Sequence, residues 1–296
     1  MTLIDFINAQ SARLEEAGVS FGHGTTNAFD EAAWLVLWAL GLPVDSLDEH
    51  ANRPITPEEF TKADDIVARR IDTRLPAAYL TKQAWLQNVP FYVDQRSIIP
   101  RSFIAELLAD SSGDGALDAW LSDHTHAVLD LCTGNGSLAV ISAMAYPEIT
   151  VDATDVSEEA LAVARINVDQ HQLAARITLF KGDLFENVRG PYDLIVCNPP
   201  YVNSDSMAKL PVEYRHEPQL ALAGGDADGM ALVRRILREA PGYMTRDAVL
   251  VLEIGNEREH FEAAFPRLEV AWLEASAGAD QVLLVTREAL MRHARG

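Results

Sequence analysis

Apolar residues in the first 75 positions recur every three to four residues, which is the spacing of amphipathic helices. Each of three such stretches follows a residue whose side chain can cap a helix, namely Thr2, Asn27 or Thr56. Asp5 and Glu59, three residues after the two threonines, complete capping boxes. The pattern therefore predicts a small helical domain over residues 1–75. Its helices are expected at 2–17, from 27 to about 41, and 56–74.

The segment 76–110 changes to short extended pieces, with Asn88 in the turn between two of them. The two strands are expected at 84–86 and 91–93, and a helix at 102–109. The sequence Ser-Ser-Gly-Asp-Gly at 111–115 has too little apolar content to pack and is typical of a flexible spacer. We therefore predict a hairpin and linker over 76–110, between the helical domain and a second domain over 111–296.

In the second domain, short apolar stretches alternate with helical periodicity. This alternation predicts right-handed βαβ units, and hence a Rossmann-like α/β fold with helices on both faces of a parallel sheet. The last two apolar stretches are separated only by 275–280, which is too short for a helical crossover and predicts an antiparallel hairpin. The seven expected strands are 127–132, 150–154, 176–180, 192–197, 248–254, 268–274 and 281–286, and the expected helices are 137–146, 157–171 and 229–240.

The chain of 296 residues carries 24 Lys and Arg against 44 Asp and Glu, a formal net charge of −20. Such a charge repels phosphate backbones and favours basic partners, so nucleic-acid binding is not expected. Both cysteines, Cys132 and Cys197, lie in apolar stretches, which fits a reducing cytoplasm. No run of eighteen apolar residues occurs, and we expect neither export nor membrane insertion.

The histidines are scattered without carboxylates or cysteines at ligand spacing, so no metal site is predicted. A Gly-x-Ser-x-Gly nucleophile elbow does not occur in the sequence, which leaves hydrolase chemistry without a candidate nucleophile. Catalysis by a bound metal ion or by an activated serine is therefore not expected.

A glycine-containing turn, Cys-Thr-Gly-Asn-Gly, follows the first strand of the predicted sheet. Gly134 and Gly136 let the backbone approach a ligand closely at the carboxyl edge, although their spacing also satisfies a dinucleotide fingerprint. Asp130 lies inside the strand just before this turn. A carboxylate there can pair with the cationic ammonium of a methionine moiety, whereas it would repel a pyrophosphate.

Two further carboxylates follow neighbouring strands. Asp155 ends the second strand, where an acid can accept hydrogen bonds from both hydroxyls of a ribose. Asp183 follows the third strand and can accept from an adenine amino group. Three acids at successive strand ends favour S-adenosylmethionine over other nucleotides.

The tetrapeptide Asn198-Pro199-Pro200-Tyr201 directly follows the fourth strand. Two consecutive prolines cannot donate to a ladder, so the strand stops there at a rigid corner. The Asn198 side-chain oxygen and the Pro199 carbonyl can hold both hydrogens of a planar NH₂ group, and the Tyr201 ring can stack on its flat face. This arrangement would orient a weakly nucleophilic amide or exocyclic amine nitrogen for in-line methyl transfer.

From residue 76 to 286, these motifs resemble the protein glutamine N5-methyltransferases, the HemK-like family. The match includes Ile98-Ile-Pro-Arg101, the corner at 198–201, and Glu217-Pro-x-x-Ala-Leu222 with Asp228-Gly229. In finer detail the chain is similar to the branch that acts on the third protein of the large ribosomal subunit. The features in common with that branch are Gly22-His-Gly-Thr25, Asp30-Glu-Ala32, Pro100-Arg-Ser102 with Ile104, Cys132-Thr-Gly134 and Glu213-Tyr-Arg-His-Glu-Pro218.

The resemblance implies a class I, seven-stranded methyltransferase domain that uses S-adenosylmethionine and a basic ribosomal protein substrate. The implied catalytic residues are Asn198, Pro199 and Tyr201. The implied cofactor residues are Asp130, Thr133, Gly134, Asn135, Gly136, Asp155, Val156, Asp183, Leu184 and Asn198. The implied substrate residues are Arg101 and Asn198 to Tyr201.

Two residues depart from the wider family. Cys132 replaces the usual first glycine of the turn, which indicates that the backbone there does not adopt a conformation that only glycine allows. Ser102 and Phe103 replace the Pro-Glu-Thr that follows the arginine in release-factor enzymes, and this weighs against release-factor specificity. If Cys132 and Cys197 end the first and fourth strands, they should lie close together and remain reduced.

Four other functions compete with methylation of a ribosomal protein. A release-factor glutamine methyltransferase would use the same corner, and so would an N-methyltransferase of RNA or DNA, because adenine and guanine amines fit it. The net charge of −20 weighs against the nucleic-acid enzyme. A dinucleotide-dependent oxidoreductase or a non-catalytic nucleotide-binding module would satisfy the glycine spacing, but Asp130 and the two prolines favour a methyltransferase.

Overall fold

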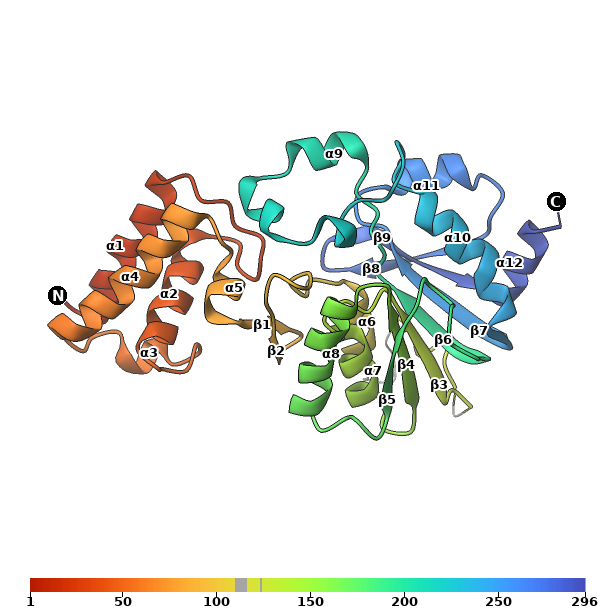
Figure 1. Cartoon of the computed structure of the whole chain (residues 1–296), viewed down its shortest axis with the longest axis horizontal. Helices are drawn as coiled ribbons and strands as arrows, with labels where there is room; N and C mark the ends of the chain where they lie inside the picture. Colours follow the sequence, from red (N-terminus) through yellow and green to blue (C-terminus); the bar gives the residue numbers. More distant parts are fainter. Residues whose placement is uncertain (110–115, 123, 296) are drawn as a thin grey trace. The chain divides into compact units, whose positions relative to one another are not determined.

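The computed structural model describes residues 1–109, 116–122 and 124–295 (Figure 1). The predicted spacer at 111–115 lies outside the described residues. Contacts divide the chain into two compact units. The first unit comprises 1–84, 93–95 and 210–216, and the second comprises 85–92, 96–209 and 217–296.

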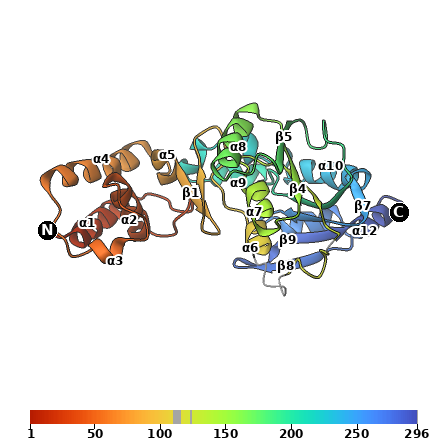
Figure 2. The ribbon, with the colours of Figure 1, turned by 90° about the horizontal axis from the view of Figure 1, so that it is seen from below.

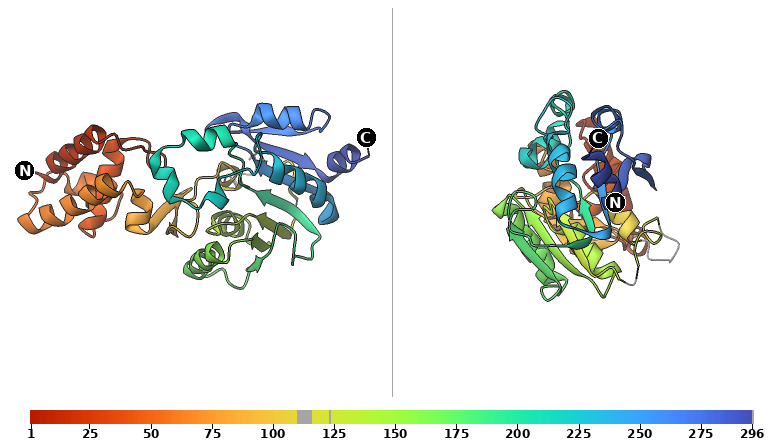
Figure 3. Two further views of the ribbon diagram at one scale, coloured as in Figure 1. Left: turned by 45° about the horizontal axis from the view of Figure 1, so that its top comes forward. Right: turned by 90° about the vertical axis from the view of Figure 1, so that its right-hand side faces the viewer.

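Three long helices, coloured red to orange, form most of the first unit (Figures 2 and 3). They are α1 (Leu3–Glu16), α2 (Ala28–Ala39) and α4 (Pro57–Thr73). Thr2, Asn27 and Thr56 cap them, and both predicted capping boxes are present. The three predicted helices are therefore confirmed. Two short helices, α3 (Leu47–His50) and α5 (Ala77–Thr81), were not predicted, because each is shorter than the window in which periodicity can be recognised.

A buried ionic network holds the first unit together. Arg70 in α4 is fully buried, and it donates to Glu31 at 2.8 Å and to the Ser20 carbonyl at 3.0 Å. Glu213, also buried, accepts from the Ser20 N–H at 3.1 Å and from Arg74 at 3.3 Å. Segment 210–216 therefore belongs to the helical unit, although it follows the Asn198 corner in the sequence.

The predicted hairpin is present as β1 (Gln83–Leu86) and β2 (Val89–Tyr92). Gln87 and Asn88 form its turn with φ of 50° and 60°, which confirms the predicted turn at Asn88. The Asn167 side chain accepts from the Tyr92 N–H at 2.8 Å and donates to the Tyr92 carbonyl at 3.0 Å. Because Asn167 lies in α8 (Glu158–Gln170), these two hydrogen bonds join β2 to α8 within the second unit.

The second unit contains a seven-stranded sheet in the order β5-β4-β3-β6-β7-β9-β8 (Figure 1). The strands are β3 (Ala127–Leu131), β4 (Thr150–Asp155), β5 (Ile177–Lys181), β6 (Tyr192–Cys197), β7 (Met244–Glu253), β8 (Ala271–Ala275) and β9 (Gly278–Thr286). The first five pair in parallel, and β9 is antiparallel to β7 and β8. The Rossmann-like fold and the terminal hairpin are confirmed, although only residues 276–277 join β8 to β9.

Alternate residues of the central strands bury opposite faces, as the period of two requires. Val128 and Leu194 lie in one core cluster, and Leu129 and Ile195 lie in the other. Helices α6 (Ile104–Ala109), α7 (Ser137–Ala145) and α8 cover one face, and α10 (Ala231–Glu239), α11 (Arg258–Ala264) and α12 (Arg287–His293) cover the other (Figure 1). The remaining helices are α9 (Ser204–Lys209), η1 (Val212–His216), η2 (Gln219–Ala221) and η3 (Ala240–Gly242).

The sheet reverses its direction of growth between β3 and β6. The chain runs from β3 outward through β4 to β5, then returns to place β6 on the other side of β3. Leu131 pairs with Cys197, so the first and fourth strands are neighbours, as predicted, and both cysteines are free. Ligands of open α/β sheets bind at the carboxyl ends of the strands at such a switch point. Among the described residues, no helix is both long enough and apolar enough to cross a membrane.

Candidate active site

The predicted cofactor residues and the Asn198 corner lie along one edge of the sheet, because the strands that lead to them end level with one another. Leu131 at the end of β3 pairs with Thr154 of β4 and with Cys197 of β6. Asp155 pairs with Lys181 at the end of β5. The glycine turn, Asp155, the segment after β5 and the Asn198 corner therefore follow four adjacent strands.

The turn after β3 is held tightly against its neighbours. A side chain on Gly136 would lie 3.1 Å from Cβ of Ala164 in α8, so the glycine permits close packing of turn and helix. The Gly134 N–H donates to Asp155 at 2.9 Å, which ties the ends of β3 and β4 together. Backbone amides and a carboxylate thus meet at the switch point.

Cys132 adopts φ of +58°, a left-handed conformation that favours glycine. The expectation that this position would not need a glycine-type backbone is therefore wrong. A side chain in this region costs about 1–2 kcal/mol, so the cysteine is tolerated at a cost that glycine would avoid.

Asp130 is fully buried beneath this turn. Its Oδ2 accepts from the Thr133 hydroxyl at 2.5 Å and from the Ala139 N–H at 3.0 Å. Its Oδ1 has no hydrogen-bond partner among the described residues. Burial raises the pKa of Asp130 to about 7. A buried carboxylate oxygen without a partner is costly, and a cationic group would relieve that cost. The ammonium of S-adenosylmethionine therefore fits this position.

Asp155 is the last residue of β4, and Val156 is the first residue after it. The Asp155 carboxylate accepts from the Gly134 N–H through one oxygen and from the Ser157 N–H through the other, at 2.8 Å. Each carboxylate oxygen can accept a second hydrogen bond, so acceptor capacity remains for ribose hydroxyls. Val156, the next residue, is apolar and 51% exposed.

Asp183 is less available than the sequence suggests. Its carboxylate is exposed and forms an ion pair with Arg235 of α10 at 3.0 Å. Leu184, the next residue, is buried and has φ of +56°. The structure therefore places both residues after β5 as expected, with Arg235 as the present partner of the acid.

Thr133 and Asn135 use their side chains within the turn. The Thr133 hydroxyl donates to Asp130, as described above. The Asn135 amide donates to the Ile98 carbonyl at 3.0 Å, and its oxygen accepts from the Ser137 N–H at 3.0 Å. Their side chains therefore shape the turn, so contacts with a cofactor would come from its backbone.

The Asn198-Pro199-Pro200-Tyr201 corner begins where β6 ends. In the part of the chain that the structure describes, the Asn198 amide has no hydrogen-bond partner, and the residue is partly exposed. After the corner, the Val202 N–H donates to the Leu222 carbonyl at 2.9 Å. The corner is thus fixed on both sides, with an amide group available for a ligand.

Arg101, a predicted substrate residue, is engaged by a buried acid. It forms two hydrogen bonds of 2.6 Å with the two carboxylate oxygens of Glu217, which also accepts from the Ile99 N–H at 3.0 Å. Such a bidentate pair is strong and directional. Arg101 therefore helps to anchor Glu217, the residue at which the chain returns from segment 210–216 to the second unit.

Glu253, at the end of β7, was missed by the sequence analysis. It is buried beside the corner, and burial raises its pKa to about 7. The signal was a single acid in the otherwise apolar run 248–254, as Asp130 is the single acid in the run 127–132.

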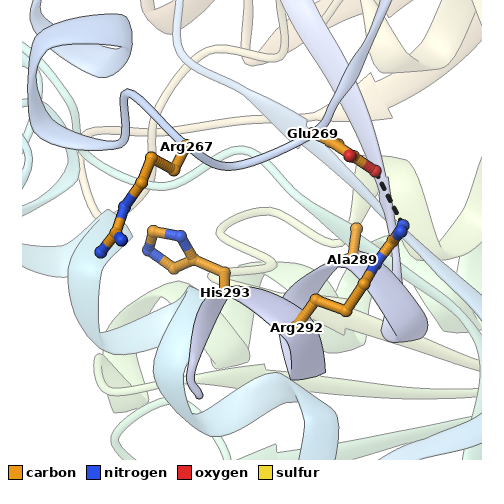
Figure 4. Close-up of a pocket in the computed structure, with 5 residues that line it drawn as sticks. All are labelled: Arg267, Glu269, Ala289, Arg292 and His293. Carbon is orange, nitrogen blue, oxygen red and sulfur yellow. Dashed lines mark hydrogen bonds and ion pairs between the residues drawn. The ribbon is translucent and has the colours of Figure 1, made fainter. Parts of the chain in front are cut away.

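A cavity of about 150 Å³ lies elsewhere in the second unit (Figure 4). It is lined by Arg267, Glu269, Ala289, Arg292 and His293. None of these is a predicted site residue, and the cavity therefore adds nothing to the proposed chemistry. Among the described residues, no group of three or more His, Cys, Asp and Glu could hold a metal ion.

Comparison with known proteins identifies the family. A family model described as the methyltransferase small domain matches residues 111–213. The ribosomal protein uL3 glutamine methyltransferase of Bordetella pertussis is 54% identical over 98% of this chain and 96% of its own length. The chain belongs to the uL3 glutamine methyltransferase family. Relatives with that name from Burkholderia pseudomallei and Bradyrhizobium diazoefficiens are 48% and 45% identical, each over 96% of this chain and over 94% and 90% of the relatives.

Membership of the uL3 glutamine methyltransferase family confirms the predicted enzyme class and cofactor. The chain is an S-adenosylmethionine-dependent methyltransferase. The resemblance noted from the sequence, including its finer branch, is also confirmed. The roles of the individual site residues remain predictions that rest on the geometry described above.

Proposed function

We propose that this protein transfers a methyl group from S-adenosylmethionine to the side-chain amide nitrogen of a glutamine in ribosomal protein uL3. The observation that carries the proposal is the 54% identity to a uL3 glutamine methyltransferase over 96% of that relative. The Asn198 corner at the sheet's switch point, next to the buried Asp130, supports it independently.

Residues at the carboxyl edge of the sheet would hold the cofactor, which supplies the electrophilic sulfonium methyl group. Asp130 would pair with its ammonium, because the unpartnered Oδ1 needs a cation or a donor. Asp155 would accept from the ribose hydroxyls, and the exposed Val156 would contact the adenine. Leu184 and Asp183 would border the adenine, with Asp183 exchanging Arg235 for the amino group.

The corner would hold the substrate amide. The Asn198 oxygen and the Pro199 carbonyl would each accept one hydrogen of the NH₂ group, and Tyr201 would stack on the amide plane. Because the lone pair of the amide nitrogen is delocalised, the nitrogen is a weak nucleophile. A fixed orientation of this nitrogen toward the methyl group would therefore contribute more to catalysis than a strong base would. Pro200 keeps the corner rigid.

The helical unit would dock the substrate, since it takes no part in the cofactor site. Residues 1–75 contain more than twice as many acidic as basic residues, and a ribosomal protein that binds RNA is basic. The same charge disfavours direct binding to nucleic acid. A ribosomal substrate and two free cysteines fit an enzyme of the cytoplasm.

Mass spectrometry of uL3 tests the function directly. Cells that lack the enzyme should contain uL3 without the added methyl group on glutamine, and purified enzyme with S-adenosylmethionine should restore that group. Asn198→Ala serves as the inactive control. Methylation of a release factor or of ribosomal RNA in place of uL3 would overturn the substrate assignment and favour the corresponding alternative.

The docking proposal needs point variants, because deletion of residues 1–75 would also remove Arg70 and Arg74, the partners of Glu213. Neutralisation of exposed acids on the helical unit should raise KM for uL3 and leave cofactor affinity unchanged. The test variants are Glu15→Gln with Glu16→Gln, and the matched controls in the second unit are Glu148→Gln with Glu159→Gln. Equal KM changes in both pairs would refute docking by the helical unit.

A further inference from the structure

The segment that follows the Asn198 corner pairs with a later part of the chain. The Val202 N–H donates to the Leu222 carbonyl, and the Gly224 N–H donates to the Val202 carbonyl, each at 2.9 Å. Both backbone polar groups of Val202 are therefore held. The direction in which the chain leaves the corner is set by this pairing as well as by the two prolines.

Tyr201, the last residue of the corner, is packed against two glycines. A side chain on Gly229 would lie 2.2 Å from the Tyr201 carbonyl oxygen, and one on Gly255 would lie 2.5 Å from Cε2 of the Tyr201 ring. Distances this short leave no room for a Cβ atom unless the tyrosine or the glycine backbone moves. The corner therefore ends in a closely packed residue, and a shift of the chain beyond it would be felt there.

The side chain of Asn203, two residues after Tyr201, is buried and makes contacts in two directions. Its amide oxygen accepts from the Ser206 N–H at 2.9 Å and caps α9. Its amide nitrogen donates to both carboxylate oxygens of Glu257, at 2.8 and 3.0 Å. If the amide oxygen and nitrogen changed places, both contacts would be lost, so the orientation of this amide is determined by its partners.

Glu257 is a buried acid whose side chain is not used by the backbone of its own helix. It is the N-cap residue of α11, and among the described residues its carboxylate makes no cap hydrogen bond to that helix. Its contacts are Asn203 and the ring Nδ1 of His260, which lies 2.6 Å from Oε2. A buried carboxylate costs free energy unless its hydrogen bonds are made. The contact with Asn203 therefore gives this acid a purpose beyond the start of α11.

We propose that Glu257 is a positioning residue for methyl transfer, which acts through Asn203 to hold the Asn198 corner in one arrangement. The inference rests on the proposed function, because the corner is the part of the protein that would hold the substrate amide. The oxygens of Asn198 and Pro199 keep their direction only if the chain beyond Tyr201 stays in place, and Asn203 fixes it there. A small misplacement of reacting groups lowers turnover steeply. Cofactor binding should not change, since Glu257 takes no part in the cofactor site.

An exchange of the acid and the amide between the two positions tests the pair. Asn203→Asp keeps the cap of α9, because aspartate caps a helix as well as asparagine does, but it places a second carboxylate against Glu257. We expect kcat on uL3 to fall about tenfold, with little change in KM or in cofactor affinity by calorimetry. In the double variant, Asn203→Asp with Glu257→Gln, donor and acceptor have changed places, and kcat should return to within about threefold of the wild type.

Two outcomes of this exchange would overturn the proposal. One is wild-type turnover in Asn203→Asp, and the other is a double variant that is no more active than Asn203→Asp. If Asn203→Asp does not fold, Asn203→Ser takes its place, because serine also caps a helix and removes the donor to Glu257 without adding a charge. Its kcat should again fall about tenfold, and an unchanged kcat would count against the proposal.

The other end of β6 provides a matched control. Asp193 accepts from the N–H groups of His126 and Ala127, at 2.9 and 3.0 Å, and from the Thr245 hydroxyl at 3.0 Å. Asp193→Ala should lower the free energy of unfolding, because these donors lose their acceptor, and it should leave kcat unchanged. If Asp193→Ala loses as much turnover as Asn203→Asp, the effect is general destabilisation, and the proposed role of Glu257 is wrong.

Hydrogen exchange separates this inference from the proposed function, because it needs no substrate. The backbone amides of Val202 and Gly224 should exchange about tenfold faster in Asn203→Asp than in the wild type, and at the wild-type rate in the double variant. Unchanged exchange in Asn203→Asp would refute the anchoring by Glu257. A wild-type enzyme that is inactive on uL3 but shows the expected exchange pattern would support the anchoring and refute the proposed function.

Discussion

Cofactor affinity should depend on pH through Asp130, and Asp130→Asn should remove that dependence. Burial raises the pKa of this carboxyl from an ordinary value of 3.8 to about 7 in the free protein. The unpartnered Oδ1 is the atom that a cofactor ammonium would approach. The ammonium attracts the carboxylate and has no such attraction for the neutral acid, so the proton must leave when the cofactor binds.

The size of the effect follows from the ionised fraction. With a pKa of about 7, roughly half of the molecules carry the charge at pH 7 and about 3% at pH 5.5. If only the ionised form binds, the apparent dissociation constant should rise about fifteenfold over this interval. An α-amino group with an ordinary pKa near 7.7–8.0 stays largely charged over the same interval, so the cofactor contributes little to the change.

Isothermal titration calorimetry at pH 7, 6.5, 6 and 5.5 would measure this dependence, and buffers of different ionisation enthalpy would count the released proton. Asp130→Asn should bind more weakly at pH 7 and show an almost flat profile. Glu253→Gln should keep the slope, although Glu253 also has a pKa of about 7. A flat profile in the wild type, or an unchanged slope in Asp130→Asn, would refute the pairing of Asp130 with the ammonium.

The raised pKa of Asp130 has the opposite effect on the stability of the protein without cofactor, because protonation of Asp130 stabilises the folded state. A folded-state pKa above the ordinary value means that the folded protein binds this proton more tightly than the unfolded chain does. The free energy of unfolding should therefore rise as pH falls from about 7 toward 3.8, as far as Asp130 alone contributes. Urea unfolding of wild type and Asp130→Asn at pH 7.5 and 6 would show whether this contribution is lost in the variant.

Three further outcomes are expected. Asn198→Ala should lower kcat about a hundredfold with an unchanged circular dichroism spectrum, as expected for loss of one preorganised polar contact, and full activity would refute the amide clamp. Asp155→Ala should weaken cofactor binding about ten- to a hundredfold by calorimetry, and an unchanged dissociation constant would place the ribose elsewhere. Arg70→Met should lower the free energy of unfolding by about 3–5 kcal/mol in urea, since Glu31 would remain buried without its cation and Glu213 would keep only Arg74, and a loss below 1 kcal/mol would contradict this.

Local patterns in the sequence were sufficient to predict the main helices and strands and to identify most of the candidate site residues. Capping at Thr2, Asn27 and Thr56 depends only on neighbouring residues, and all three helices begin where predicted. The strands around Asp130 and Asn198 were predicted for the same reason, because a buried parallel strand needs a continuous apolar run. The acids at the strand ends stood out against those runs.

Contacts between residues far apart in the chain could be decided only by the tertiary structure. Glu213 joins the helical unit because Arg70 and Arg74, some 140 positions earlier, supply the charge that its burial requires. Asp183 meets Arg235, and Arg101 meets Glu217, through pairings that no local spacing encodes. Glu253 is a lone acid in an apolar run, as Asp130 is, yet its hydrogen bond with Ser102 exists only because the residues just before α6 meet the end of β7 in the fold. The sequence determines which residues can form a helix or strand and which can carry a charge. The tertiary structure determines which charged and polar groups must pair with one another, because burial removes the water that would otherwise solvate them.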